Sequence, residues 1–319
     1  MKSTRYLLLS VLASASFIVA AQEAYPNKAV RIVVPIGAGG VADSGARIVA
    51  RRLSEELGQP VIVENRPGAN QVIGTALVAT APADGYTLLW TTGGIAALSV
   101  LAKSVPFDAF RDFAPVTLGG RSNLAVIGSA SMPGNTLASF LSHARQNPGK
   151  LNYGTTTGSV TLIFEHLKQL ADLDITAVPY KSTPNVWTDL FGGQIQVMLE
   201  APTAAKAQAA GGRAKILAVT GGARSADLPD VPTLSEQGLK DFNVYTWQGM
   251  FVRAGTPPDR LARIRNAMAN VMGNADVRAQ FVKIGVEPVG STPAELSDLM
   301  RSDLQLWRSV AKKANIQPE

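Results

Sequence analysis

Short runs of apolar, often β-branched residues recur about every twenty residues, and segments with the apolar spacing of an amphipathic helix separate them. The first three runs are residues 30–34, 61–63 and 86–90. Between the first two, Val49 and Leu53 fall on one face of a helix. This alternation is typical of parallel strands joined by crossover helices. The first part of the chain is therefore predicted to form a βαβαβ unit.

The same alternation starts again after a proline-rich connection, which predicts a second α/β unit. Its helix over residues 137–145 is followed by further apolar runs. The strands predicted after the first unit are residues 116–118, 124–127, 151–153, 177–180, 195–199 and 216–219. Near the end, Thr292 to Glu295 form a capping box with a proline at the first helical position. Two final helices are therefore predicted, over residues 259–272 and 294–314.

The N-terminal segment has the pattern of a secretory signal peptide. Lys2 and Arg5 precede an apolar run that ends in small residues at Ala20 and Ala21. A membrane anchor needs about 20 apolar residues, whereas this run is shorter and contains serines. We therefore expect residues 1–21 to be removed and the mature protein to be periplasmic. The chain has no cysteine, so a lipoprotein is not expected.

Composition narrows the function classes further. Hydrophobic residues make up 46% and charged residues 17% of the 319 residues, which is typical of a globular protein of roughly two domains. Without cysteine there are no thiol nucleophiles or disulfides, and His143 and His166 alone offer little for metal or acid–base chemistry. The net charge of +6 is scattered, unlike the basic stripe of a nucleic-acid-binding protein. Enzyme motifs are absent, so no catalytic residue, metal or cofactor is predicted.

The most informative segment is the glycine-rich stretch 35–43, between the first predicted strand and the first predicted helix. Glycines let a ligand approach the backbone there, and the unpaired N–H groups of the helix start attract anions. A dinucleotide site is one interpretation, because Gly37, Gly39 and Ala42 match G-x-G-x-x-A and Glu64 ends the next strand. The secretory signal argues against this interpretation. A glycine turn that only packs is a further alternative.

A set of motifs follows in order from the start of the mature chain to the C-terminal part. They are Tyr25-Pro26-Asn27-Lys28, Glu64-Asn65-Arg66-Pro67-Gly68-Ala69, Ala83-Asp84-Gly85-Tyr86-Thr87-Leu88-Leu89, Val178-Pro179-Tyr180-Lys181, Asp189-Leu190-Phe191-Gly192-Gly193-Gln194 and Leu228-Pro229-Asp230-Val231-Pro232-Thr233. Together with the glycine-rich stretch, they resemble the periplasmic substrate-binding proteins of tripartite tricarboxylate transporters, the Bug family.

The resemblance implies an α/β, two-lobed type II periplasmic-binding-protein fold. Each lobe would be a mostly parallel sheet flanked by helices, and two strands would form the hinge. Lobe 1 would comprise residues 22–123 and 249–319, and lobe 2 residues 124–248. The chain would cross between the lobes near residues 124–127 and return near residues 249–252.

In that family a small carboxylate lies between the lobes, held mainly by backbone N–H groups and bridging waters, and is delivered to integral-membrane transporter subunits. A monomer is the default expectation for a receptor that shuttles its ligand, and no cofactor is expected. The ligand-binding residues it implies are Ile36, Gly37, Ala38, Gly40, Asp43, Thr91 and Thr92 of the first lobe, and Thr157, Gly158, Ser159, Tyr180, Ser182 and Glu200 of the second.

Three of these residues have a second interpretation. Asp43 is expected to cap the first helix, the common role of an Asp at such a position, and the alternative is that it approaches an amino or hydroxyl group of the ligand. Tyr180 is either a packing residue at a strand end or a hydrogen-bond donor in the cleft. Glu200 would repel an anionic ligand, so we expect it to bond to a hydroxyl, an amine or a water at the far end of the ligand.

One departure from the family pattern bears on the ligand. Residues 95–98 are Ile-Ala-Ala-Leu where family members have a polar stretch, so a carboxylate less polar than citrate is expected. Two other functions stay open at this point. One is an exported α/β enzyme with a dinucleotide-like loop, and the other is a ligand-binding partner of a signalling sensor.

Overall fold

The strands of the first lobe follow the apolar runs of the sequence and form a six-stranded sheet. The computed structural model describes residues 25–318. The strand order is β11 (Glu287–Pro288), β4 (Phe113–Ser122), β10 (Thr246–Arg253), β3 (Thr87–Thr92), β1 (Val30–Val34) and β2 (Val61–Asn65). The helices packed on it are α1 (Val41–Leu57), α2 (Val72–Thr80), α3 (Gly94–Leu101), α8 (Pro258–Gly273), α9 (Ala275–Lys283) and α10 (Pro293–Lys313), with a 3-10 turn at Ala69–Gln71.

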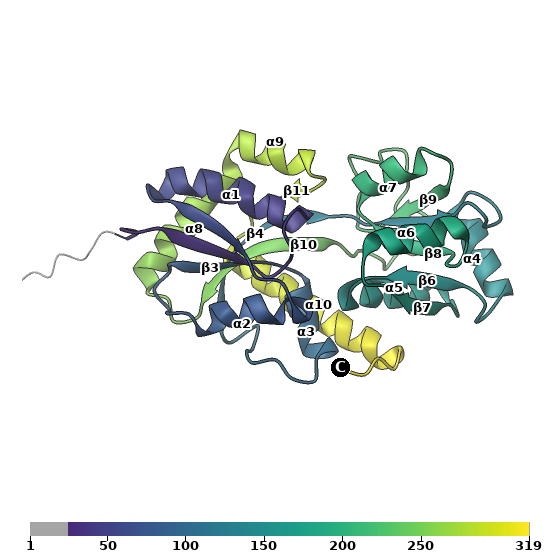
Figure 1. Cartoon of the computed structure of the whole chain (residues 1–319), viewed down its shortest axis with the longest axis horizontal. Coiled ribbons are helices and arrows are strands. Elements are labelled where there is room, and N and C mark those ends of the chain that lie inside the picture. The colour runs from purple at the N-terminus through teal and green to yellow at the C-terminus, as the bar shows by residue number, and fades with distance from the viewer. Residues whose placement is uncertain (1–24, 319) are drawn as a thin grey trace, which may run out of the picture.

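The second lobe has a five-stranded sheet and lies beside the first along the long axis of the molecule (Figure 1). Its strand order is β7 (Thr176–Pro179), β6 (Asn152–Thr155), β8 (Val197–Glu200), β5 (Ala125–Ser129) and β9 (Ala214–Val219). Its helices are α4 (Leu137–Gln146), α5 (Gly158–Ala171), α6 (Thr183–Gly192) and α7 (Pro202–Ala209). The predicted two-lobed α/β architecture is therefore confirmed.

Both sheets are mixed, which corrects the expectation of mostly parallel sheets. β1 pairs in parallel with β2 and β3, and β6 pairs in parallel with β7 and β8. The strands next to the crossings run the other way: β10 is antiparallel to β3 and β4, and β5 is antiparallel to β8 and β9. The reason is that these strands carry the chain out of one lobe and back, rather than through a crossover helix.

The chain crosses from β4 to β5 through Asn123 and Leu124 and returns to the first sheet at Thr246. Residues 246–248, expected in lobe 2, pair with β3 and β4 of the first sheet. Trp247 is buried there among first-lobe residues such as Phe251, which explains why the strand starts earlier. The rest of the division into lobes stays a proposal.

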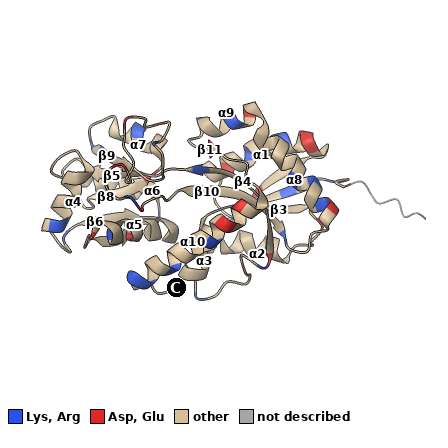
Figure 2. Ribbon diagram, turned by 180° about the vertical axis from the view of Figure 1, so that it is seen from behind, with Lys and Arg blue, Asp and Glu red and all other residues tan. Residues whose placement is uncertain are grey.

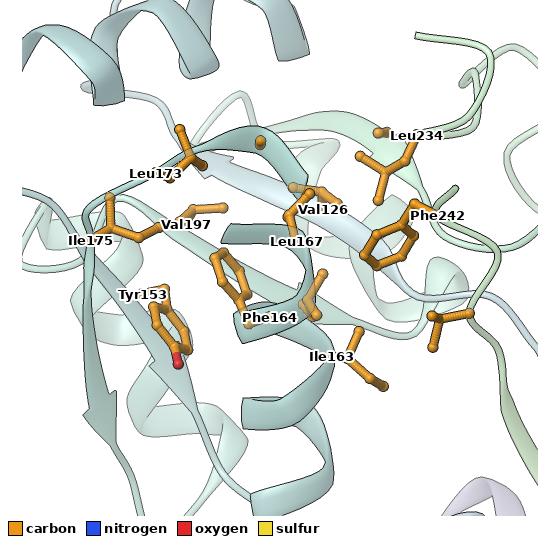
Figure 3. Packing of buried hydrophobic residues seen from close by; sticks show 14 of the residues in the cluster. Val126, Tyr153, Ile163, Phe164, Leu167, Leu173, Ile175, Val197, Leu234 and Phe242 are labelled. Carbon is orange, nitrogen blue, oxygen red and sulfur yellow. The ribbon is translucent and has the colours of Figure 1, made fainter. Parts of the chain in front are cut away.

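The second-lobe core forms around α5 and the strand that precedes it. Tyr153 of β6 and Phe164 of α5 are stacked with their ring centroids 4.1 Å apart (Figure 3). Leu167, one turn further along α5, faces Val126 of β5. All four side chains have essentially no exposed surface, so they anchor the helix whose N-terminus faces the first lobe.

The last helix, α10, takes part in the cores of both lobes. Leu296 and Met300 in its first half pack with first-lobe residues, among them Trp247. Trp307 and Val310 in its second half belong to the second-lobe core. Figure 1 shows the helix running from beneath the first sheet to a position below α5. A single helix therefore ties the two lobes together on one side.

Lys and Arg positions are dispersed along the ribbon of both lobes (Figure 2) and form no continuous basic stripe among the described residues. Across residues 25–318, no helix combines the length and the apolar composition that a membrane span requires. The predicted signal peptide, residues 1–21, lies outside the described residues.

Candidate functional site

A cavity of about 170 Å³ lies where the two lobes face each other. From the first lobe it is lined by Ile36 and Gly37 of the loop after β1, by Pro67, Gly68, Asn70 and Gln71 after β2, and by α3. Thr157 and Ser159 from the start of α5 close it from the second lobe. Four of the predicted site residues, Ile36, Gly37, Thr157 and Ser159, are thus brought together in one cavity.

Three further cavities border the cleft, and two of them share lining residues with a neighbouring cavity. One of about 560 Å³ shares Asn70, Leu98, Leu101 and Thr157 with the first, and adds Gly158 and Tyr180. One of about 90 Å³ lies at the hinge and includes Thr92, Trp247 and Gln248, and one of about 80 Å³ lies within the second lobe against Glu200. Among the described residues that line these four cavities there is no Lys, Arg or His. The cleft therefore offers an anion neutral donors rather than a cation.

The loop after β1 is shaped so that its backbone is accessible. Gly39 has φ of +87°, a left-handed conformation that favours glycine. Added Cβ atoms at Gly37 and Gly40 would meet nothing within 4 Å, so the loop is open to its surroundings. Gly40 is the N-cap of α1 and supplies no capping side chain, which leaves the first N–H groups of this helix without a side-chain acceptor.

Asp43 holds this loop in place. Its carboxylate, 3% exposed, accepts hydrogen bonds from the N–H of Gly39 (2.9 Å), Nε of Arg47 (3.0 Å) and Nδ2 of Asn65 (2.9 Å). Burial acts to raise the pKa of Asp43, but these hydrogen bonds outweigh it and keep the pKa below its ordinary value. Because Gly40 is the N-cap, the expected capping role of Asp43 is wrong.

Gln71 also lines the cleft, although the sequence pattern did not predict it as a site residue. Its Oε1 accepts hydrogen bonds from Oγ1 of Thr91 (2.8 Å) and of Thr92 (3.3 Å), so it fixes both hydroxyls at the end of β3. Ala69, Asn70 and Gln71 all have positive φ, which turns this segment into the cleft. Gly68 followed by Asn70 was the available signal, since both residue types tolerate such conformations.

The second-lobe arm is the N-terminus of α5. Thr157 caps it by accepting from the N–H of Val160. Gly158 lies so close to the first lobe that a Cβ there would be 2.6 Å from Cδ1 of Leu101. This contact brings α3 against α5 at the mouth of the cleft.

Tyr180 and Ser182 have local partners or positions that limit their access to a ligand. The Tyr180 hydroxyl donates to Oδ2 of Asp189 at 2.7 Å. Burial, together with this hydrogen bond, raises the pKa of Tyr180 to about 12. Ser182 is the N-cap of α6 and lines none of the four cavities. Four other predicted site residues also line none of them: Ala38, Gly40, Asp43 and Thr91.

The apolar wall of the cleft is one face of α3. Ala97, Leu98 and Leu101 line the cavities, and Leu101 lies four residues after Ala97 and three after Leu98, on the same face of the helix. Ile95 is fully buried and packs into the first-lobe core, so it lies behind the wall. Of the aliphatic wall expected over residues 95–98, Ala97 and Leu98 therefore line the cavities, and Leu101 extends the wall by about one helical turn.

A half-buried acid supports the hinge end of the cleft. Nε1 of Trp247 donates to Oδ2 of Asp303 on α10 at 2.7 Å. Burial raises the pKa of Asp303 from 3.8 to about 6, against the lowering effect of the Trp247 hydrogen bond. The folded state therefore holds this proton more tightly than the unfolded chain, and the resulting stability is lost as pH rises through about 6.

Asp303→Asn is therefore expected to stabilise the protein at neutral pH by about 1–2 kcal/mol, because the amide stays neutral and its oxygen can still accept from Trp247. The gain should vanish as pH falls from about 6 to 3.8, which chemical unfolding at several pH values measures. Asp298→Asn is the control, because Asp298 on the same helix is 75% exposed. Destabilisation of Asp303→Asn at neutral pH would contradict this prediction.

Two α/β lobes joined by crossing strands, with a cleft of loops and helix N-termini between them, define the class of two-lobed solute-binding proteins. The sequence model of the tripartite tricarboxylate transporter family receptor (TctC) matches residues 45–316. The chain therefore belongs to this receptor family.

Named relatives agree with this assignment. Protein BugT of Bordetella pertussis is 30% identical over 91% of this chain and 90% of its own length. The structure of Rhodopseudomonas palustris Rpa4515 with adipate is 32% identical, with a TM-score of 0.81 over 92% of this chain and 100% of that one. MatC of the same organism, with bound malate, is 28% identical, with a TM-score of 0.76 over 90% and 99%.

The dinucleotide interpretation of the glycine-rich stretch gains no support. Glu64, the candidate ribose-binding acid, forms ion pairs with Arg31 and Arg66. It lines none of the four cavities of the cleft. The family assignment instead matches the interpretation of this stretch as an anion-binding loop.

Proposed function

We propose that the protein captures a small organic carboxylate in the cleft between its lobes and delivers it to the integral-membrane subunits of a tripartite tricarboxylate transporter. It would act in the periplasm as a monomer without catalytic activity, after removal of residues 1–21. The observation that carries this proposal is the cleft itself, which presents backbone N–H groups and hydroxyls from both lobes. The adipate and malate in the two Rhodopseudomonas palustris structures support the ligand class.

The carboxylate would be held at the open N-terminus of α1, beside Ile36 and Gly37. Oriented N–H donors satisfy a carboxylate without a buried cation. Thr157 and Ser159 approach the same cavity from the second lobe, so a ligand that contacts both lobes favours the closed arrangement. Thr92, Gly158, Tyr180 and Glu200 would line the rest of the path, while Ala38, Gly40, Asp43, Thr91 and Ser182 would act by shaping it.

The apolar face of α3 would contact the carbon chain of the ligand. Leu98 and Leu101 both lie on the shared wall of the two larger cavities, and burial of apolar surface there favours aliphatic over heavily hydroxylated acids. A carboxylate less polar than citrate is therefore the expected ligand.

Thermal unfolding of residues 22–319 against a panel of carboxylates tests the proposal. A ligand at a hundred times its Kd adds about 2.7 kcal/mol to the free energy of unfolding, so the right acid should raise Tm clearly. Aliphatic acids should shift Tm more than citrate, and NAD should have no effect. If no carboxylate raises Tm while NAD does, the proposal is overturned and the dinucleotide interpretation of the glycine-rich stretch is favoured.

A further inference from the structure

Glu200 is the one carboxyl group that lines the cleft among the described residues. It ends β8 and faces the cavity of about 80 Å³ within the second lobe. Thr155 and Thr156 line both this cavity and the larger one of about 560 Å³, so the two spaces meet at these residues. In this arrangement, the far end of a ligand held at the α1 loop would lie along the wall that Thr155 and Thr156 share between the two cavities.

The Glu200 carboxylate is only partly satisfied by the protein. Oε1 accepts from the N–H of Ala201 at 2.8 Å, and the Trp187 side chain donates a second hydrogen bond. A carboxylate has about four acceptor positions, so acceptor capacity is left for a further donor. The cavity wall next to it adds only neutral polar groups, the hydroxyls of Thr155, Thr156 and Thr183.

No cation offsets this carboxyl group. Within residues 25–318 Glu200 takes part in no ion pair, and no Lys, Arg or His lines the cavities of the cleft. Burial raises the pKa of Glu200, which means that the ionised form is poorly solvated and gains from a bound donor. A second carboxylate at this end of the cleft would instead face a like charge in a partly dehydrated space.

We propose that Glu200 determines specificity by selecting carboxylates whose far end carries a hydrogen-bond donor, such as an ammonium, hydroxyl or amide group, and by excluding dicarboxylates. The inference rests on the proposed function and deepens it. It separates this chain from the two Rhodopseudomonas palustris relatives, whose structures hold the dicarboxylates adipate and malate.

Titration calorimetry of residues 22–319 at neutral pH, with two matched ligand series, tests this inference. The six-carbon series comprises adipate and three six-carbon monocarboxylates, which carry an ω-amino group, an ω-hydroxy group or no substituent. The four-carbon series comprises succinate and the three corresponding four-carbon monocarboxylates. In one or both series, the ω-amino or the ω-hydroxy acid should bind more tightly than the dicarboxylate, by a factor of about ten or more. The amino and hydroxy arms distinguish a charged from a neutral donor.

The variant Glu200→Gln should reverse this order, because its amide can donate to a ligand carboxylate while its oxygen still accepts from Ala201. Dicarboxylate affinity should rise roughly tenfold and ω-amino acid affinity should fall by a similar factor. Glu55→Gln is the matched control, since Glu55 on the outer surface of α1 is 59% exposed, and it should leave the order unchanged. The wild-type comparison needs no variant and holds even if Glu200→Gln fails to fold.

The outcomes distinguish a failure of the selection by Glu200 from a failure of carboxylate capture. If dicarboxylates bind the wild type as tightly as the matched ω-amino and ω-hydroxy acids, the selection by Glu200 is wrong while carboxylate capture stands. Tight adipate binding with proton uptake would mean that Glu200 binds in its protonated form, which also overturns the inference. If no acid of either series, nor any in the thermal panel, binds, the proposed function fails and the inference fails with it.

Discussion

Trp307→Ala is expected to lower the free energy of unfolding by about 3–5 kcal/mol, the cost of removing a large aromatic side chain from a core. Trp307 is 5% exposed and belongs to the second-lobe core, although it lies on a helix whose first half packs in the first lobe. The cavity would open between α10, α3 and α5, where the lobes touch. Denaturant unfolding followed by circular dichroism measures the loss.

The control for this prediction is Arg308→Ala, the next residue on α10, whose side chain is exposed. Its removal should change the free energy of unfolding by less than about 0.5 kcal/mol. A loss below about 1 kcal/mol for Trp307→Ala would mean that the second half of α10 contributes little to the second-lobe core.

Gly74→Ala should both destabilise the protein and weaken ligand capture. A Cβ at Gly74 on α2 would lie 2.6 Å from the carbonyl oxygen of Arg66 and 2.8 Å from Cα of Pro35. Both are backbone atoms, so a loop must move, and overpacking of this kind costs about 1–3 kcal/mol. Pro35 precedes the loop after β1 and itself lines the cleft, so the displacement should reach Ile36 and Gly37.

Gly273→Ala is the matched control, because Gly273 ends helix α8 and a Cβ there meets nothing within 4 Å. It should be neutral or stabilise the protein by up to about 1 kcal/mol, as glycine to alanine does in a helix. Thermal unfolding with and without a bound carboxylate measures both effects. Unchanged Tm and unchanged ligand shift for Gly74→Ala would show that the loop tolerates the extra methyl group.

Local periodicity predicts the elements of this fold closely, but not the directions of all strands. Residues 30–34 form β1 at the predicted bounds, and the predicted final helix at 294–314 is α10, displaced by one residue. The antiparallel course of β5 and β10 depends on where the chain leaves each lobe, which is a long-range property that no local pattern encodes. The packing of Trp307 in the opposite lobe is of the same kind.

The parts of the site that depend on backbone conformation could be predicted from the sequence. The parts that depend on contacts between side chains far apart in the sequence could not. The glycine-rich stretch is recognisable because Gly39 needs a left-handed conformation and sits before a helix. Gln71 was not predicted because its partners, Thr91 and Thr92, are about twenty residues away at the end of strand β3. The α3 wall was predicted only in part, with Ile95 included and Leu101 left out, because an apolar run does not reveal which of its faces points to the core.

The order of the chain has a consequence for biosynthesis. β10 lies between β3 and β4 in the first sheet, yet it is made only after the whole second lobe, and the second-lobe core in turn needs Trp307 near the C-terminus. Neither lobe can complete its core while the ribosome is still extending the chain. The nascent protein therefore stays incompletely folded at least until α10 has been synthesised.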